Sequence, residues 1–119
     1  MNTRITYLYR DASNYKQGGD VVVNGRVTLS DLEPLLYFGE LFIPGDVGLP
    51  ELQANFETQG FAFPTADDHV WHELESCEPT EATPTVDISA EKLIDAFRKA
   101  SEQGWKVRQA EQRLRQKAA

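Results

Sequence analysis

Two segments near the start of the chain have the pattern of neighbouring β-strands, and they restrict the fold more than any other feature. Residues 3–9 alternate in character, and one face of this segment is formed by Ile5, Tyr7 and Tyr9. A polar stretch over 11–19 follows, and the β pattern resumes in a run of three valines before an Asn-Gly turn. This order predicts two antiparallel strands joined by a long polar loop.

Two helices are predicted beside these strands. Ser30 and Glu33 have the spacing of a capping box, and a short helix with an apolar side follows the cap. A longer helix begins at Ser89, because Leu93 and later apolar residues lie at helical spacing, and Gly104 is predicted to end it. We therefore predict an α+β fold, in which a small antiparallel sheet is packed by a short helix and a long C-terminal helix.

The length of 119 residues suits one domain. We predict a single α+β domain over 1–104, followed by a basic C-terminal tail over 105–119 that is helical or frayed and has little to bury. Residues 76–87 combine prolines, threonines and acids without apolar periodicity, which predicts an internal loop. Residues 41–50 are predicted to form a loop that lies on the core, and 59–63 a short strand.

Charge is divided unevenly along the chain. No Lys or Arg occurs from Val27 to Glu91, and this stretch holds fourteen carboxylates. The first 91 residues contain four cations and sixteen carboxylates, a net charge of −12, whereas 92–119 contain eight cations and three carboxylates, a net charge of +5. A field of this kind disfavours direct nucleic-acid binding and favours a basic protein surface, a divalent cation or the chain's own tail.

The densest group of chemically active side chains is the segment DDHVWHELES, residues 67–76. As a helix, this segment places His69, His72 and Glu73 on one face, where two imidazoles and a carboxylate could bind one metal ion. As a strand, it separates the two imidazoles, because successive side chains alternate between faces. The strand is favoured, since a sheet needs more than two strands and Pro79 can end the segment.

This segment supplies the candidate site residues. His69 and His72 are candidate metal ligands, and no cofactor is predicted apart from such a divalent metal. Alternatively, the segment is a partner-binding surface with Trp71 as its anchor, formed by Asp67, Asp68, Trp71, Glu73 and Glu75. A purely structural interpretation also fits, in which the tryptophan packs, one histidine forms hydrogen bonds within the fold and the acids solvate an edge strand.

Cysteine content and hydropathy indicate the compartment. Cys77 is the only cysteine, so no intramolecular disulfide can form and a reducing environment is expected. A catalytic thiol would need a base such as His72, but small buried cysteines are far more common than catalytic ones. The first residues lack the apolar core of a signal peptide, and no apolar run approaches the ~20 residues of a membrane span. We therefore expect a soluble, cytoplasmic protein that does not enter a membrane.

Three segments taken together and in order, ITYLYRDASNYK, FIPGDVGLPELQ and DDHVWHELES, resemble a group of small uncharacterised bacterial proteins. The resemblance spans about residues 3–76. It implies a bacterial, cytosolic, single-domain α+β protein and carries no activity over to this chain.

Three classes of function fit these observations. We favour a small acidic, non-enzymatic protein-binding module, of the kind found among inhibitors, antitoxins and immunity-type proteins, that acts on a basic partner such as a nucleic-acid-binding protein. One alternative is a metal-dependent hydrolase that uses His69 and His72. The other is a self-associating structural or regulatory unit, in which the segment from Lys92 onward packs against the acidic body of its own or a neighbouring subunit of a homo-oligomer.

Overall fold

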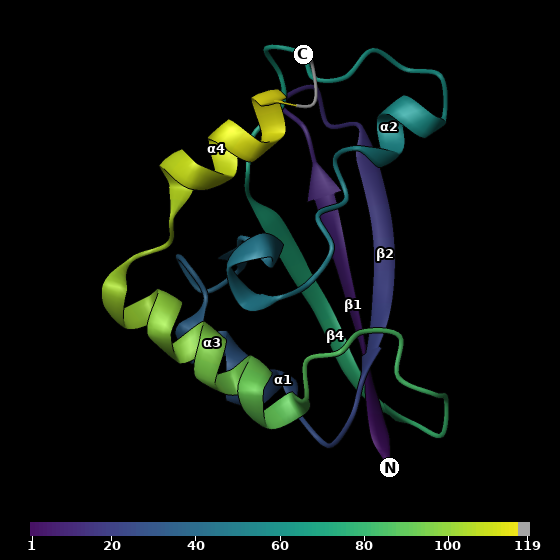
Figure 1. Cartoon of the computed structure of the whole chain (residues 1–119), viewed down its shortest axis with the longest axis vertical. Coiled ribbons are helices and arrows are strands. Elements are labelled where there is room, and N and C mark those ends of the chain that lie inside the picture. The colour runs from purple at the N-terminus through teal and green to yellow at the C-terminus, as the bar shows by residue number, and fades with distance from the viewer. Residues whose placement is uncertain (117–119) are drawn as a thin grey trace.

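A four-stranded antiparallel sheet and a layer of helices form the α+β fold of this chain, as predicted (Figure 1). The structure is a computed structural model that describes residues 1–116. The strand order is β2-β1-β4-β3. The strands are β1 (Asn2–Arg10), β2 (Lys16–Val23), β3 (Leu41–Phe42) and β4 (His72–Thr80). The helices are α1 (Leu29–Leu32), α2 (Asn55–Thr58), α3 (Ala90–Gln103) and α4 (Val107–Gln116), with short 3-10 turns η1 (Glu33–Leu35) and η2 (Pro44–Val47).

Strand β1 lies at the centre of the sheet because its alternating pattern buries one complete face. Ile5, Tyr7 and Tyr9 have no exposed surface, as predicted. Strand β2 is longer than predicted and begins at Lys16, so the polar loop is shorter than the sequence suggested. The glycine pair belongs to the strand, where a Cβ on Gly19 would lie 2.8 Å from the Leu52 side chain. Glycine therefore lets Leu52 pack directly against the backbone of β2.

The DDHVWHELES segment enters strand β4 at its second histidine, which confirms the strand interpretation for that part. The strand then continues to Thr80, so the loop predicted over 76–87 was wrong for its first five residues. These residues are extended because β1 offers them a partner along its whole length, to the pairing of Asn2 with Thr80. On its other side β4 pairs with β3 only through His72 and Glu73. The exposed charges and the proline beyond that point suit an open sheet edge.

Two further local predictions were wrong. The N-terminal helix is capped by Thr28 rather than Ser30, and the Asp31 side chain completes the capping box. The cap lies two residues earlier than predicted, and Pro34 is the second residue of a separate 3-10 turn, which replaces a continuation of the helix. The strand predicted over 59–63 is absent, because a turn at Gly60, with a φ of 89°, follows the end of α2 and the next three residues have no regular structure.

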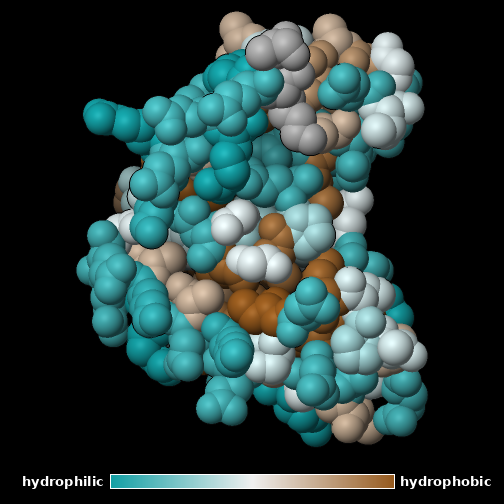
Figure 2. Space-filling view, in the orientation of Figure 1, coloured by the Kyte–Doolittle hydropathy of each residue, from teal (hydrophilic) through white to brown (hydrophobic). Residues whose placement is uncertain are grey.

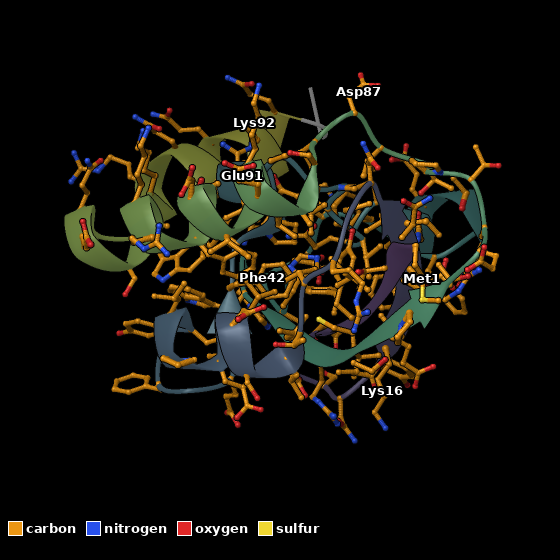
Figure 3. The ribbon with its side chains drawn as sticks, turned by 90° about the horizontal axis from the view of Figure 1, so that it is seen from below. Met1, Lys16, Phe42, Asp87, Glu91 and Lys92 are labelled. Carbon is orange, nitrogen blue, oxygen red and sulfur yellow. The ribbon has the colours of Figure 1, made fainter. Side chains whose placement is uncertain are left out.

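Helix α3 agrees with its prediction. Ser89 accepts a hydrogen bond from the backbone N–H of Lys92, and Gly104 ends the helix with a φ of 93°. Helices α1 and α3 lie on the same face of the sheet (Figure 3). Phe42 lies between α3 and the strands. The ring of Phe42 packs against Phe97 of α3 and Tyr7 of β1, with centroid distances of 5.4 Å in both pairs. These aromatic contacts join the two layers.

The basic segment after Gly104 is helix α4, and it packs on the body of the protein. Contrary to the expectation that this segment has little to bury, Ala110 and Leu114 are almost fully buried. Ala110 belongs to a second apolar cluster with Ile43 and Val70. Within residues 1–116, none of the helices has both the length and the apolar character needed to cross a membrane.

Cations of α4 contact acidic residues of the body. The Asp46 carboxylate accepts a 2.8 Å hydrogen bond from the backbone N–H of Lys106, at the start of α4. Arg113 forms an ion pair with Glu51 at 2.8 Å. Gly45 lies directly beside this pair, and a Cβ there would lie 2.5 Å from the end of the Arg113 side chain, which would have to shift. The chain therefore neutralises part of its acidic surface internally.

Candidate functional site

The five predicted contact residues do not form one surface. Asp67 and Asp68 lie in the turn before β4, and Trp71 lies in an aromatic cluster near the start of the strand. Glu73 forms an ion pair with Arg10 at 2.9 Å, across the sheet from the core. Glu75 is exposed at the irregularity where the register of β1 and β4 shifts. The separation arises because the segment passes from a turn at Asp67 and Asp68 into β4, which begins only at His72, and because the register shift at Glu75 interrupts the strand pairing.

Both histidines use their ring nitrogens within the fold. Nδ1 of His69 accepts a hydrogen bond from the Trp71 backbone N–H at 3.0 Å, and Nε2 contacts the Arg10 carbonyl oxygen at 2.6 Å. Nε2 of His72 accepts a hydrogen bond from the Leu52 backbone N–H, and Nδ1 lies 3.2 Å from the Val70 carbonyl oxygen. In the described part of the chain, no group of three His, Cys, Asp or Glu residues could hold a metal ion. The metal hypothesis gains no support from this geometry.

His72 is a neutral core residue. It has no exposed surface, and burial lowers the pKa of its imidazole from 6.5 to about 3, with a smaller lowering contribution from His69. Burial raises the pKa of the Cys77 thiol to about 11, which keeps it protonated at neutral pH. A thiolate nucleophile activated by this histidine is therefore not supported, because the imidazole nitrogens are bonded to the backbone.

Asp68 has an internal role. Its Oδ1 accepts a 2.7 Å hydrogen bond from the Tyr9 hydroxyl, and its Oδ2 accepts one of 2.8 Å from the Thr65 backbone N–H. Only 6% of Asp68 is exposed. Burial and this hydrogen bond both raise the pKa of Tyr9, so the phenol remains a donor. The carboxylate holds the 65–68 turn against the sheet and presents little surface to a partner.

Asp67 and Asp68 nevertheless line a pocket that brings together distant parts of the sequence. This acidic pocket has a volume of about 440 Å³, and the residues that define its chemistry are Asp11, Tyr15, Lys16, Phe61, Asp67 and Asp68. Its lining comes mainly from the β1–β2 loop, the start of β2 and the segment that follows α2. Gln17 and Gln59 also line it, and their side-chain amides bond to one another at 2.8 and 3.1 Å.

The loops around the acidic pocket are tied together by hydrogen bonds. The Ser13 hydroxyl donates to Asp67 Oδ2 at 2.6 Å, and the backbone N–H of Ala12 donates to the Asp67 carbonyl oxygen at 3.0 Å. Oδ1 of Asp11 accepts hydrogen bonds from the backbone N–H groups of Ser13 and Tyr15, both at 2.9 Å. These bonds position the two loops, and within residues 1–116 they leave Oδ2 of Asp11 and Oδ1 of Asp67 without a hydrogen-bond donor.

The chemistry of the acidic pocket suits a cationic group. Three carboxylates and one ammonium line it, and none of the three carboxylates forms an ion pair with another residue of the described chain. Tyr15 and Phe61 beside them are 66% and 61% exposed. Arg115 donates to the carbonyl oxygens of Thr65 and Asp68, but its side chain does not line the pocket. A planar guanidinium could bond a carboxylate and stack on an aromatic ring here.

Trp71 belongs to a separate aromatic groove. This groove has a volume of about 540 Å³, and its aromatic residues are Tyr37, Phe38, Trp71 and Trp105. The rings of Tyr37 and Trp71 are stacked, with a centroid distance of 4.5 Å and an interplanar angle of 9°. Phe38 is 82% exposed and has a φ of 51°, a backbone conformation that is costly for a bulky residue. The groove is therefore apolar, and its most exposed ring is held at a strained turn.

Comparison of the chain with protein-family models, with curated proteins and with solved structures gives no match. The geometry of the chain's own surfaces is thus the basis for a functional proposal. Sequence reasoning missed Asp11, Tyr15 and Phe61 as site residues, because they belong to two segments about fifty positions apart. Only Tyr15, an aromatic side chain in the polar 11–19 stretch, could have drawn attention.

Proposed function

We propose that this protein is a non-enzymatic protein-binding module whose acidic pocket takes a cationic side chain of a basic partner. The observation that supports the proposal is the combination of three carboxylates without ion-pair partners and two exposed aromatic rings in one concave site. The net charge of −12 over the first 91 residues attracts a basic surface, and the pocket supplies a specific contact within that field.

Arginine is the side chain that fits this pocket best. Its guanidinium bonds carboxylates through two parallel N–H groups and stacks on aromatic faces, whereas lysine offers only a point charge. Asp11 and Asp67 are the partly exposed acceptors, while Tyr15 and Phe61 provide the ring faces. An inhibitor or immunity-type protein that blocks a nucleic-acid-binding surface would have these properties, because such surfaces are rich in arginine.

Binding of short peptides tests the pocket directly. Tri-arginine is expected to shift the NMR signals of residues 11–17 and 59–68, more strongly than tri-lysine, and tri-glutamate is expected to have no effect. Asp67→Asn should weaken tri-arginine binding by about three- to tenfold, since one charge-assisted hydrogen bond is lost. The matched control is Glu78→Gln, an exposed carboxylate on β4 outside the pocket, which should leave binding unchanged.

The partner can then be identified in cells. A photo-crosslinking amino acid at Phe61 should capture a basic protein, and capture should fall with added salt and with Asp67→Asn. The proposal fails if tri-arginine shifts are absent, or if Glu78→Gln weakens binding as much as Asp67→Asn does.

The aromatic groove supports self-association as a second candidate function. The exposed Phe38 ring and the groove lined by Tyr37, Trp71 and Trp105 lie on the same patch. A two-fold axis would let each copy insert its phenylalanine into the groove of the other, because the same patch then supplies both sides of the interface. A second copy of the chain is the occupant that this arrangement fits.

Phe38→Asn tests self-association. Asparagine adopts the left-handed backbone more readily than phenylalanine, so the variant should retain or gain about 1 kcal/mol in unfolding free energy. The dimer dissociation constant, measured by analytical ultracentrifugation, should rise by about tenfold or more with loss of the aromatic anchor. The matched control is Phe61→Asn, an exposed phenylalanine outside the groove. A wild-type chain that stays monomeric at millimolar concentration would rule this candidate out.

A further inference from the structure

A second charged surface, opposite in sign to the acidic pocket, lies between helices α3 and α4. This cationic cleft has a volume of about 580 Å³, and its cations are Lys92, Lys99, Lys106 and Arg113. Each cation follows the previous one by seven residues, which is about two helical turns or ~10 Å along a helix. The spacing keeps Lys92 and Lys99 on one side of α3, while Lys106 immediately precedes α4 and Arg113 lies within it. Hydrophilic side chains cover α3 and α4 on this face of the molecule (Figure 2).

The three lysines of the cationic cleft have no carboxylate partner among residues 1–116. The salt bridges of that part of the chain include none of them. The two carboxylates that line the cleft are already occupied. Asp95 pairs with Arg98 at 2.9 Å, and Asp46 accepts the backbone N–H of Lys106 at 2.8 Å and lies 3.8 Å from Arg113. In a chain of net charge −7, this is a local excess of positive charge.

The walls of the cationic cleft allow close approach of a ligand. Its lining includes the small residues Gly45, Ala96, Ala100 and Gly104, so no large apolar side chain fills the space between the cations. The amide side chains of Gln103 and Gln109 also line it and can donate hydrogen bonds to an anion. Lys92 projects from α3 on the side of the molecule opposite to Lys16, which lines the acidic pocket (Figure 3). The two charged sites are therefore separate.

We propose that the cationic cleft binds a small anion that carries two or more phosphate groups. Several ammonium groups around one concave volume match the charge density of linked phosphates, and lysine binds phosphate as a point charge. The volume lies in the range of small-molecule sites, about 300–1,000 Å³, whereas a docked protein needs a wider surface. This site is independent of the protein-binding function proposed above and uses none of the acidic-pocket residues.

Isothermal titration of the full chain with sodium tripolyphosphate tests the proposal. Saturable binding is expected, and Lys99→Gln or Lys106→Gln should each weaken it by about three- to tenfold. Arg108→Gln is the matched control, because it removes an exposed cation of α4 that does not line the cleft, and it should leave affinity unchanged. ATP serves as a second probe: equal affinity shows that the phosphate chain alone is recognised, whereas tighter binding of ATP shows recognition of a nucleotide.

The results that would overturn the proposal are specific. Absence of saturable tripolyphosphate binding would do so, as would an equal loss of affinity in Arg108→Gln, which would indicate a diffuse charge effect. Tighter binding of hexa-glutamate than of tripolyphosphate would assign the cleft to an acidic protein segment instead. Both lysine variants are surface changes, so their unfolding curves should match the wild type and a loss of binding cannot be attributed to misfolding.

Discussion

Lowering the pH from 7 to 4 is expected to reduce the free energy of unfolding by about 3 kcal/mol through His72 alone. The imidazole has no exposed surface, and its pKa falls from 6.5 to about 3 on folding. Below pH 6.5 the unfolded chain takes up a proton on this histidine, whereas the folded chain does not until the pH nears 3. Stability is therefore fully present above pH 6.5 and is lost as the pH falls between these two values.

The fold explains why His72 resists protonation. Its Nε2 accepts a hydrogen bond from the Leu52 backbone N–H. Protonated Nε2 would be a second donor that faces this N–H, so the hydrogen bond would be lost. The rings of Tyr7, Tyr9 and Phe42 surround it at centroid distances of 5.3–6.2 Å, and water is excluded. The charged imidazolium would have to be accommodated in this apolar setting at a large cost.

Urea denaturation followed by circular dichroism at several pH values between 4 and 7 measures this effect. His72→Gln is the informative variant, because glutamine can accept the Leu52 hydrogen bond but does not titrate. It should be less stable than the wild type at pH 7 by about 2 kcal/mol, from imperfect hydrogen bonding and packing. Surface carboxylates titrate equally in both proteins, so the wild type should lose its advantage of about 2 kcal/mol by about pH 5, where the two stability curves should cross. Parallel curves would show that His72 does not carry the pH dependence.

Ending the chain at Gln103 is expected to destabilise the protein by on the order of 5 kcal/mol. The truncation removes the buried side chains of Ala110 and Leu114 and uncovers Ile43 and Val70. It also removes Trp105, whose ring packs against Phe97 and Trp71 at centroid distances of 5.8 and 6.3 Å. The basic segment is thus expected to be part of the cooperative fold rather than a solvated appendage.

Two point variants separate the causes of this loss. Leu114→Ala should cost about 2–3 kcal/mol, because it leaves a cavity in a buried position. Arg113→Gln should cost less than about 1 kcal/mol, since its guanidinium is partly exposed and surface ion pairs contribute little. Urea denaturation of all three chains checks the order. A truncated chain as stable as the wild type, or a larger effect of Arg113→Gln than of Leu114→Ala, would contradict the prediction.

The parts of the fold that sequence reasoning predicted are those set by neighbouring residues. The alternation of Ile5, Tyr7 and Tyr9 indicates a half-buried strand without knowledge of its partners. Ser89 and Gly104 bound α3 because caps act within one helical turn. Local signals were less decisive at Thr28 and Ser30, which are both suitable caps with an acid three residues later. The structure places the cap at the earlier one, where Asp31 completes the box.

The candidate surfaces depend on contacts between distant residues. Asp11 and Asp67 meet because the β1–β2 loop bonds to the turn before β4, and nothing in either segment alone indicates this. The predicted contact residues were drawn from one run of sequence. That run crosses from a turn into β4, and its residues have different long-range partners: Asp68 turns inward to Tyr9, Glu73 pairs with Arg10 across the sheet, and Trp71 stacks on Tyr37.

The amino-acid sequence was sufficient for the α+β class, the main strand and helix, and the division of charge into an acidic body and a basic end. These properties depend on composition and on periodicity over a few residues. Both are visible in one amino-acid sequence without knowledge of its tertiary contacts. The tertiary structure decided which of these charged residues pair with one another. Helix α4 neutralises Asp46 and Glu51 but leaves three carboxylates in the acidic pocket and three lysines in the cationic cleft without ion-pair partners in the described chain. Whether two charges meet depends on how the helices pack, and packing is set by the whole core rather than by the residues that carry the charge.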